Sequence, residues 1–159
     1  MPETHKHQLQ DCNCLAVRQA ARHVTQFYDQ LLAASGLRTT QFSMLARLRS
    51  KGPMTINALA AEMVMDRTTL GRNIQPLERD GLILIRQGAA DRRNKELHLT
   101  ESGVARLRAG IKLWAEAQAR FEAAFGGERS GELRDLLRMV VATNFGADGA
   151  PERQRAAPG

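Results

Sequence analysis

The chain has 159 residues, of which 43% are hydrophobic and 25% charged, and this fits one compact domain or a small domain with a dimerising extension. That length is short for a multidomain enzyme. Its 23 Lys and Arg residues outnumber its 17 Asp and Glu residues, so a net charge of +6 makes nucleic acid a candidate partner. No run approaches the roughly 18 apolar residues that span a bilayer, and the polar start holds no apolar signal core. We therefore expect a cytoplasmic protein without a membrane segment.

Two helices are predicted in the first third of the chain, after a flexible segment at residues 1–10. Apolar side chains recur at helical spacing from residue 11 to about 35, with Asp11 as the predicted N-cap and Gly36 as the stop. A second helix is predicted from about residue 40 to 50. It carries one apolar stripe, and Gly52 and Pro53 oppose its continuation.

Two more helices follow with only a short link between them. Thr55 is the predicted N-cap of a helix over residues 56–63, and Asp66 is the predicted N-cap of another over 67–80. The short link around Val64 is the spacing of a helix-turn-helix. In the second of these helices, apolar residues at i, i+4 and i+7 face inward and leave the polar side chains outside; the inward residues are Leu70, Ile74 and Leu77.

A β-hairpin with a basic tip is predicted next. Residues 82–86 and 96–100 are short strand-like runs, and residues 87–95 join them. The tip holds Arg92, Arg93 and Lys95, and we expect Asp91 to brace one of these cations by an ion pair.

The last third of the chain is helical. A stripe with intervals of 3 and 4 residues is typical of a helix that packs against another helix; it comprises Val104, Leu107, Ile111, Trp114, Gln118, Phe121 and Phe125. Gly126 and Gly127 end this helix, and a final helix carries a second apolar face. One small core cannot bury all these faces, so we predict a symmetric homodimer.

These elements predict a mainly α fold with a small β-hairpin: a winged helix-turn-helix core with N- and C-terminal dimerisation helices. The DNA-binding domain is expected at residues 36–100 and the dimerisation region at 11–35 and 101–145. Residues 146–159 lack apolar periodicity and are expected to form a disordered tail.

The polar face of the helix over 67–80 suits the major groove of DNA. Arg pairs with guanine, Asn with adenine, and the Thr methyl meets the thymine methyl; the predicted contacts are Arg67, Thr68, Thr69, Arg72 and Asn73. Asp91, Arg92, Arg93 and Lys95 add a wing, since Arg enters narrow minor grooves. Between residues 67 and 95, seven basic residues stand against three acidic ones.

Other function classes are less well supported. The sequence has no G-x-x-x-x-G-K-[ST], H-E-x-x-H or G-x-S-x-G motif, so we predict neither an enzyme nor a cofactor. An architectural DNA-binding protein and a helical module that docks on protein remain alternatives. Sequence preference at high salt separates a specific regulator from an architectural binder, and a docking module binds no DNA.

The only cysteines, Cys12 and Cys14, leave three interpretations open. The positive end of a helix favours the thiolate form, which would suit a redox sensor. The thiols can equally be structural, or can bind a metal with His5 and His7, although C-x-C alone is a weak metal pattern and no metal site is predicted.

The most distinctive motif of the chain lies in the hairpin: residues 91–100, DRRNKELHLT, have the pattern D-x-R-x5-L-T and are followed by Gly103. Further characteristic residues are Gly36-Leu37, Gln41, Leu59-Ala60, Asp66-Arg67-Thr68-Thr69 and residues 77–82 (LERDGL). With these matches, from about residue 15 to 145, the chain resembles the multiple-antibiotic-resistance-regulator (MarR) family of winged-helix transcription factors, whose wing carries this pattern.

This resemblance implies a homodimer on a pseudopalindromic operator, with recognition helices in successive major grooves and wings in the flanking minor grooves, where Arg93 would enter. The family consists mostly of repressors released by small, often aromatic anionic ligands, and in some members by thiol oxidation. Its usual effector site implies a pocket near Trp114, with Phe42 as a second aromatic wall and Arg22 and His23 as candidates for binding a carboxylate.

Overall fold

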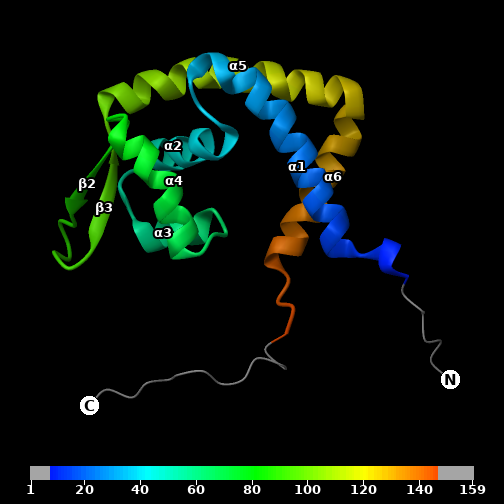
Figure 1. The fold of residues 1–159 in the computed structure, drawn as a ribbon, viewed down its shortest axis with the longest axis horizontal. Coiled ribbons are helices and arrows are strands. Elements are labelled where there is room, and N and C mark those ends of the chain that lie inside the picture. Colours follow the sequence, from blue (N-terminus) through cyan, green and yellow to red (C-terminus); the bar gives the residue numbers. More distant parts are fainter. Residues whose placement is uncertain (1–7, 147–159) are drawn as a thin grey trace. The chain divides into compact units, whose positions relative to one another are not determined.

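The computed structural model describes residues 8–146, and its helices and strands follow the predicted order (Figure 1). The fold is mainly helical with one small antiparallel sheet, as predicted. These residues divide into two compact units, one ending at Gln118 and the other beginning at Ala119. The predicted tail after Gly146 and most of the predicted flexible segment 1–10 lie outside the described residues. No helix within residues 8–146 is long and apolar enough to cross a membrane.

Helix α1 (Asn13–Leu32) begins later than the sequence predicts. Asp11 ends a short 3-10 helix, η1 (Leu9–Asp11), and Cys12 is the N-cap of α1. The Cys12 Sγ accepts a hydrogen bond from the backbone N–H of Leu15 at 3.4 Å, so a sulfur atom takes the place expected for the Asp11 carboxylate.

The end of α1 follows the sequence prediction more closely. A 3-10 turn, η2 (Ala33–Ser35), continues it, and Gly36 stops it in the left-handed region at φ +74°. The carboxylate of Asp29 in α1 then accepts hydrogen bonds from both the N–H and the hydroxyl of Thr39 at 2.7 Å. These bonds join α1 to the first residue of the next helix.

Three helices form the core of the first unit: α2 (Thr39–Lys51), α3 (Ile56–Glu62) and α4 (Arg67–Arg79). Figure 1 shows them grouped beside the first half of the long helix α5 (Glu101–Phe125). The apolar residues whose helical spacing predicts an inward face are buried in all three helices, except Met63 of the α3 stripe, which is half-buried; the buried residues include Phe42, Leu45, Leu48, Leu59, Leu70, Ile74 and Leu77. Apolar periodicity therefore identified the core correctly.

The sheet has three strands in the order β1-β3-β2, all antiparallel. The hairpin strands β2 (Ile83–Gln87) and β3 (Lys95–Leu99) differ by one residue at each end from the predicted runs. Lys95 pairs with Gln87 and therefore belongs to β3, not to the tip. Strand β1 (Met54–Thr55) was not predicted, because two residues are too short to show an alternating pattern.

Two glycines let α5 lie close against the winged core. A Cβ on Gly103 would stand 2.1 Å from the carbonyl oxygen of Leu82, and one on Gly110 would stand 3.0 Å from the ring of Phe42. The buried face of α5 is therefore formed by Gly103, Leu107, Gly110 and Ala117. The predicted stripe runs beside it: Leu107 is buried, whereas Ile111, Trp114 and Phe125 are exposed.

The second unit contains the end of α5 and helix α6 (Gly127–Ala142). Within it, Arg134 pairs with Glu122 at 3.3 Å, and the buried Ser130 hydroxyl donates to the carbonyl of Gly126 at 2.7 Å. Most of the predicted apolar face of α6 is exposed; the exposed residues are Leu136, Leu137, Val140 and Val141.

Gly103→Ala should lower the free energy of unfolding by about 1–3 kcal/mol, because its methyl group overlaps a backbone carbonyl that the sheet holds in place. Gly71→Ala is the matched control: this glycine lies within α4 and has no atom within 4 Å of a built Cβ. Better helix propensity should make the control more stable by about 0.5–1 kcal/mol. Urea unfolding measures both, and equal stability of the two variants would contradict the close approach.

Candidate nucleic-acid interface

The start of α4 is organised by one carboxylate. Asp66, the N-cap, accepts the backbone N–H of Thr69 on Oδ1 at 2.8 Å and the Thr69 hydroxyl on Oδ2 at 2.6 Å. The hydroxyl bond first, and the backbone N–H bond second, lower the pKa of Asp66 below its ordinary value. The carboxylate is thus held in its charged form, and the capping predicted from the sequence is confirmed.

The outer face of α4 presents the predicted hydrogen-bonding side chains. Arg67, Thr68, Thr69 and Arg72 are all exposed. Asn73 differs, because it is half-buried and its side-chain N–H donates to the carbonyl of Thr69 at 2.8 Å. One hydrogen of that amide is therefore already used inside the helix.

An ion-pair cluster ties α3 to α2 behind this face. The Glu62 carboxylate of α3 pairs with Lys51 of α2 and lies 3.9 Å from the Arg47 guanidinium. The hydrogen bond from Lys51 is the largest cause that lowers the pKa of Glu62, and the charge of Arg47 acts in the same direction. These contacts connect the two helices that precede α4.

The tip of the hairpin is folded by its own backbone and by Asp91. The Asp91 carboxylate accepts the N–H of Arg93 at 2.9 Å and the side-chain amide of Asn94 at 3.2 Å. A Cβ on Gly88 would stand 2.8 Å from the Asp91 carbonyl oxygen, so the tip closes over a buried glycine. The predicted ion pair of Asp91 is absent among the described residues, because its carboxylate turns to the nearer backbone N–H and amide donors of the turn.

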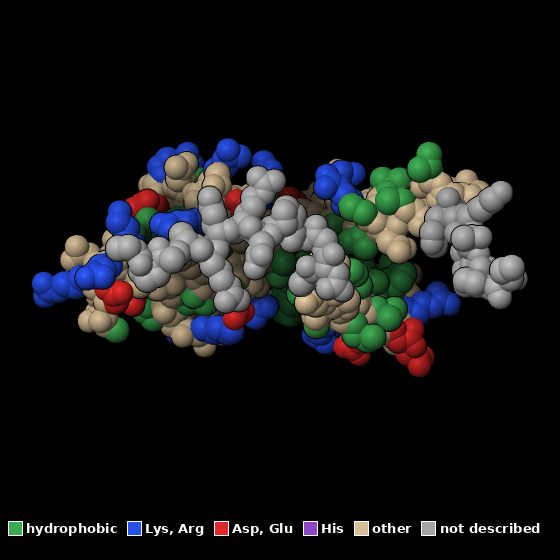
Figure 2. Space-filling model, turned by 90° about the horizontal axis from the view of Figure 1, so that it is seen from below, with side chains coloured by type: hydrophobic (Ala, Val, Ile, Leu, Met, Phe, Trp, Pro, Cys, Tyr) green, Lys and Arg blue, Asp and Glu red, His purple; other side chains and the backbone are tan. Residues whose placement is uncertain are grey.

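The cations of this hairpin remain available to a ligand. Arg92, Arg93 and Lys95 are exposed, and none of the three forms an ion pair with another described residue. Figure 2 shows Lys and Arg side chains projecting at the end of the molecule that Figure 1 assigns to the hairpin. Two arginines on the tip and Lys95 at the start of β3 thus form a basic surface suited to phosphates or to a minor groove.

The base of the hairpin is joined to α5 by Thr100. Its hydroxyl donates to the carbonyl of Gly81 at 2.7 Å and accepts the N–H of Gly103 at 3.0 Å. Its own N–H donates to the Leu82 carbonyl at 3.1 Å. These bonds give a physical reason for the Leu-Thr pair and the following glycine in the wing motif.

The structure brings two of the four residues suggested for an effector into contact. Phe42 and Trp114 do meet, with stacked rings at 6.2 Å, but Phe42 is buried in the core. Arg22 and His23 are exposed on α1. The contact of α1 with α5 is made further along, where the Tyr28 hydroxyl donates to the side chain of Gln118.

A cation that was not predicted from the sequence lies on the same face of α5 as Trp114. Arg106 on α5 is half-buried, and a guanidinium nitrogen lies 2.7 Å from where a Cβ on Gly36 would stand. Arg106, Gly110 and Trp114 are spaced by four residues and so share one face of α5. That spacing was the available signal, but only the fold shows that Gly36 and Phe42 lie against the same face.

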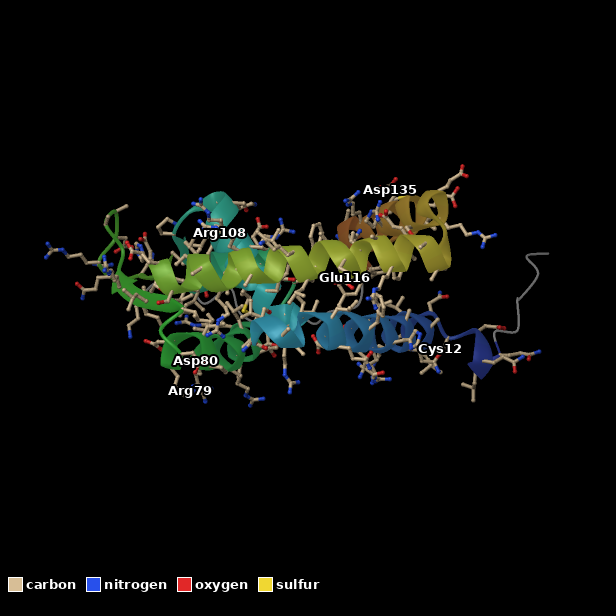
Figure 3. All side chains as sticks on the ribbon, turned by 90° about the horizontal axis from the view of Figure 1, so that it is seen from above. Cys12, Arg79, Asp80, Arg108, Glu116 and Asp135 are labelled. Carbon is tan, nitrogen blue, oxygen red and sulfur yellow. The ribbon has the colours of Figure 1, made fainter. Side chains whose placement is uncertain are left out.

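The two thiols lie at the start of α1, away from α4. Figure 3 labels Cys12 at the start of α1, far from Arg79 and Asp80 at the end of α4. Both cysteines are exposed and unbonded to each other, with Cys12 outside the helix and Cys14 inside its first turn. The described residues contain no cluster of metal ligands, and His5 and His7 lie outside them.

Comparison with known proteins identifies this architecture. The family model described as "MarR family" matches residues 37–95. The transcriptional regulator MosR of M. tuberculosis is 34% identical, with 86% of this chain and 100% of that chain covered and a TM-score of 0.72. The structure of MosR in complex with DNA is 35% identical, covers 83% of this chain and 99% of that chain, and has a TM-score of 0.68.

Two further regulators match by sequence. YwoH of Bacillus subtilis, an uncharacterised regulator, is 34% identical over 85 residues, which are 54% of this chain and 61% of that protein. The chain thus spans less than two thirds of that relative. The transcriptional repressor NicR of Pseudomonas putida is 29% identical over 82% of this chain and 83% of that protein. An identity of 34% across the whole of MosR, on the same winged fold, shows that this chain belongs to the MarR family, whose members are DNA-binding transcriptional regulators and not enzymes.

Proposed function

We propose that the protein is a homodimeric repressor that reads a pseudopalindromic operator with α4 and holds the flanking minor grooves with its hairpin tips. The observation that carries this proposal is the contrast between the acidic and the basic side chains of the interface. Its carboxylates, Asp66 and Asp91, are satisfied by hydrogen bonds inside the protein, whereas its arginines are exposed without an ion-pair partner among the described residues. Such a surface favours the binding of a polyanion.

Each group on this surface has a separate role. Arg72 reaches base edges in the major groove, with Arg67, Thr68, Thr69 and Asn73 around it. Arg92, Arg93 and Lys95 contact phosphates and the minor groove. Asp91 acts indirectly, because it holds the turn from which Arg93 projects.

The proposed specificity is tested with the DNA just upstream of the coding region of this protein. Fluorescence anisotropy compares that duplex with a scrambled one at about 50 and 200 mM salt. A preference of about a thousandfold or more that survives the higher salt supports a specific regulator. Equal binding that is lost with salt supports the architectural alternative, and the absence of binding to either duplex supports the docking module.

Arg72→Ala should weaken operator binding by about 1–3 kcal/mol and relax the preference mainly at one base pair, because Arg72 makes a base contact. Lys95→Ala should weaken all sequences alike and flatten the slope of log K against log salt by about 1, because Lys95 contacts phosphate. Binding isotherms on a set of single-base operator variants measure both effects. Uniform losses for both variants would contradict these assignments.

The dimer follows from apolar surface that a single chain leaves in water. The exposed fractions are 46% for Leu15 of α1 and 46% for Ile111 of α5. In the second unit, the exposed fractions are 59% for Leu136, 41% for Leu137 and 64% for Val141. Apolar side chains on this scale, spread along helices, mark a protein interface.

Leu137→Asp should shift the dimer to monomer at low micromolar concentration, because a charge at the centre of the apolar face of α6 would be buried without a partner. Arg138→Asp is the control, since it adds a carboxylate to the same helix at an exposed position that follows Leu137 in sequence but lies about 100° away around the helix, outside that face. Sedimentation velocity gives the assembly state and far-UV circular dichroism checks helix content. A Leu137→Asp protein that stays dimeric places the interface elsewhere; Ile111→Asp then tests α5 in the same way.

Two routes of release from DNA extend this proposal. A small aromatic anion would bind near the stacked Phe42 and Trp114 rings, with its carboxylate on the Arg106 guanidinium of the same face of α5 instead of on Arg22 and His23. An oxidant would act at Cys12, because its sulfur is the N-cap of α1. Converting that thiol to a disulfide with Cys14, while a peroxide is reduced, alters the cap and loosens the start of the helix.

The release routes are separated in one anisotropy experiment on the operator complex. Hydrogen peroxide should release the wild type at least several-fold more readily than Cys12→Ser/Cys14→Ser, with full recovery after dithiothreitol. Benzoate should release the wild type but not Arg106→Gln, because the neutral amide cannot pair with the carboxylate. Identical responses of wild type and variant would remove the corresponding route and leave operator binding intact.

A further inference from the structure

The hydrogen bonds at the start of α4 decide whether the Thr69 hydroxyl is available to DNA as a donor or as an acceptor. A threonine hydroxyl has one hydrogen to donate and two lone pairs that accept. Here the hydrogen points to Asp66 Oδ2 at 2.6 Å, while the other carboxylate oxygen holds the Thr69 backbone N–H at 2.8 Å. Thr69 is exposed, so the remaining lone pairs of its oxygen face outward as acceptors.

The carboxylate keeps this hydrogen because the bond is charge-assisted. An O–H donor to an ionised oxygen makes a bond roughly twice as strong as one between neutral groups. The lowered pKa of Asp66 agrees with a carboxylate that is ionised at neutral pH. A base edge that offers only another acceptor therefore cannot compete for the hydroxyl hydrogen.

Neighbouring contacts hold Thr69 in this arrangement. The side-chain amide of Asn73 donates to the Thr69 carbonyl at 2.8 Å, one turn further along α4. The hydroxyl bond to Asp66 favours one staggered rotamer of the Thr69 side chain, and the bonds of its N–H and carbonyl hold the backbone from which that side chain projects. Thr68, the preceding residue, is exposed and has no such side-chain bond to Asp66 among the described contacts.

We infer that Asp66 is a specificity-determining positioning residue, which takes the hydroxyl hydrogen of Thr69 and so makes that side chain an acceptor that selects adenine or cytosine. In the major groove, adenine N6 and cytosine N4 donate hydrogen bonds, whereas guanine O6 and thymine O4 only accept them. The inference rests on the proposed reading of DNA by α4, and it assigns to Asp66 a role beyond starting the helix.

Asparagine at position 66 separates the two roles of this residue. Asn and Asp are both strong N-caps, so Asp66→Asn retains the cap through its carbonyl oxygen. Its amide donates where the carboxylate accepted, and the Thr69 hydroxyl hydrogen is released. Thr69 then offers a donor to the groove, which suits guanine or thymine at the same position.

The test is a base-preference profile, measured with an operator that the wild type selects from random duplexes and with all four bases at each position. The position that Thr69 faces is the one whose preference collapses in Thr69→Val, which removes the hydroxyl and retains the shape. There the wild type and Thr69→Ser should prefer adenine or cytosine by about tenfold. Asp66→Asn should lose or reverse this preference, and Asp66→Asn/Thr69→Val should match Thr69→Val alone.

The control is Glu78→Gln, which removes one negative charge from an exposed position on the same helix. Glu78→Gln should raise the affinity for all duplexes without changing the base-preference profile. If the loss of one negative charge were itself the cause, Glu78→Gln and Asp66→Asn would change the profile in the same way. A wild-type preference for guanine or thymine at the Thr69 position overturns the inference, and this arm does not depend on folding of Asp66→Asn. The inference is also overturned if folded Asp66→Asn keeps the wild-type base-preference profile, or if Thr69→Val changes the base preference at no position of the operator.

The failure of this inference is distinguishable from the failure of the proposed function. If the wild type selects no sequence from the random duplexes, then α4 does not read DNA and the proposed function fails. If it selects a sequence that depends on Arg72 but not on the hydrogen-bond character of Thr69, only the role of Asp66 is overturned.

Discussion

The close approach of α5 to the sheet is the constraint on which the first unit depends. The helix can start beside the hairpin only because Gly103 has no side chain where the Leu82 carbonyl lies, and Thr100 bonds to both sides of this junction. Seven residues further along, Gly110 receives the ring of Phe42 in the same way. The part of α5 that belongs to the first unit is thereby packed against the winged core, so the hairpin and α4 keep a defined relation within this unit.

The interface shows how a protein arranges charge for a polyanionic partner. Carboxylates near DNA would repel phosphates, yet Asp66 and Asp91 are needed to shape the helix start and the hairpin tip. Their oxygens are occupied by nearby N–H and O–H donors, which spread the negative charge into the protein. The arginines proposed to contact DNA form no ion pair among the described residues, so an anion need not displace a competing carboxylate; they are Arg67, Arg72, Arg92 and Arg93.

The same hydrogen bonds link local structure to recognition. Helix caps are usually discussed for their effect on helix stability. A cap that also accepts a hydrogen bond from a side-chain hydroxyl changes whether that hydroxyl can donate to a base. At the other end of this unit, the sulfur of Cys12 starts α1, so a reactive atom is also a structural one. In both proposals the group that caps the start of a helix also affects the response to an external molecule, a DNA base at α4 and an oxidant at α1.

Much of this structure was predictable from sequence because it depends on short-range patterns. Apolar spacing identified the core residues of α2, α3 and α4, cap residues placed the starts of α3 and α4, and the wing motif identified the family. The tertiary structure alone decided that Asp91 bonds to backbone rather than to an arginine, and that Cys12 replaces Asp11 as a cap. It also decided which face of α5 is buried, and it brought Arg106 beside Gly36 on the face shared with Trp114. These features depend on which donors and which backbone atoms meet in space, and linear spacing does not contain that information.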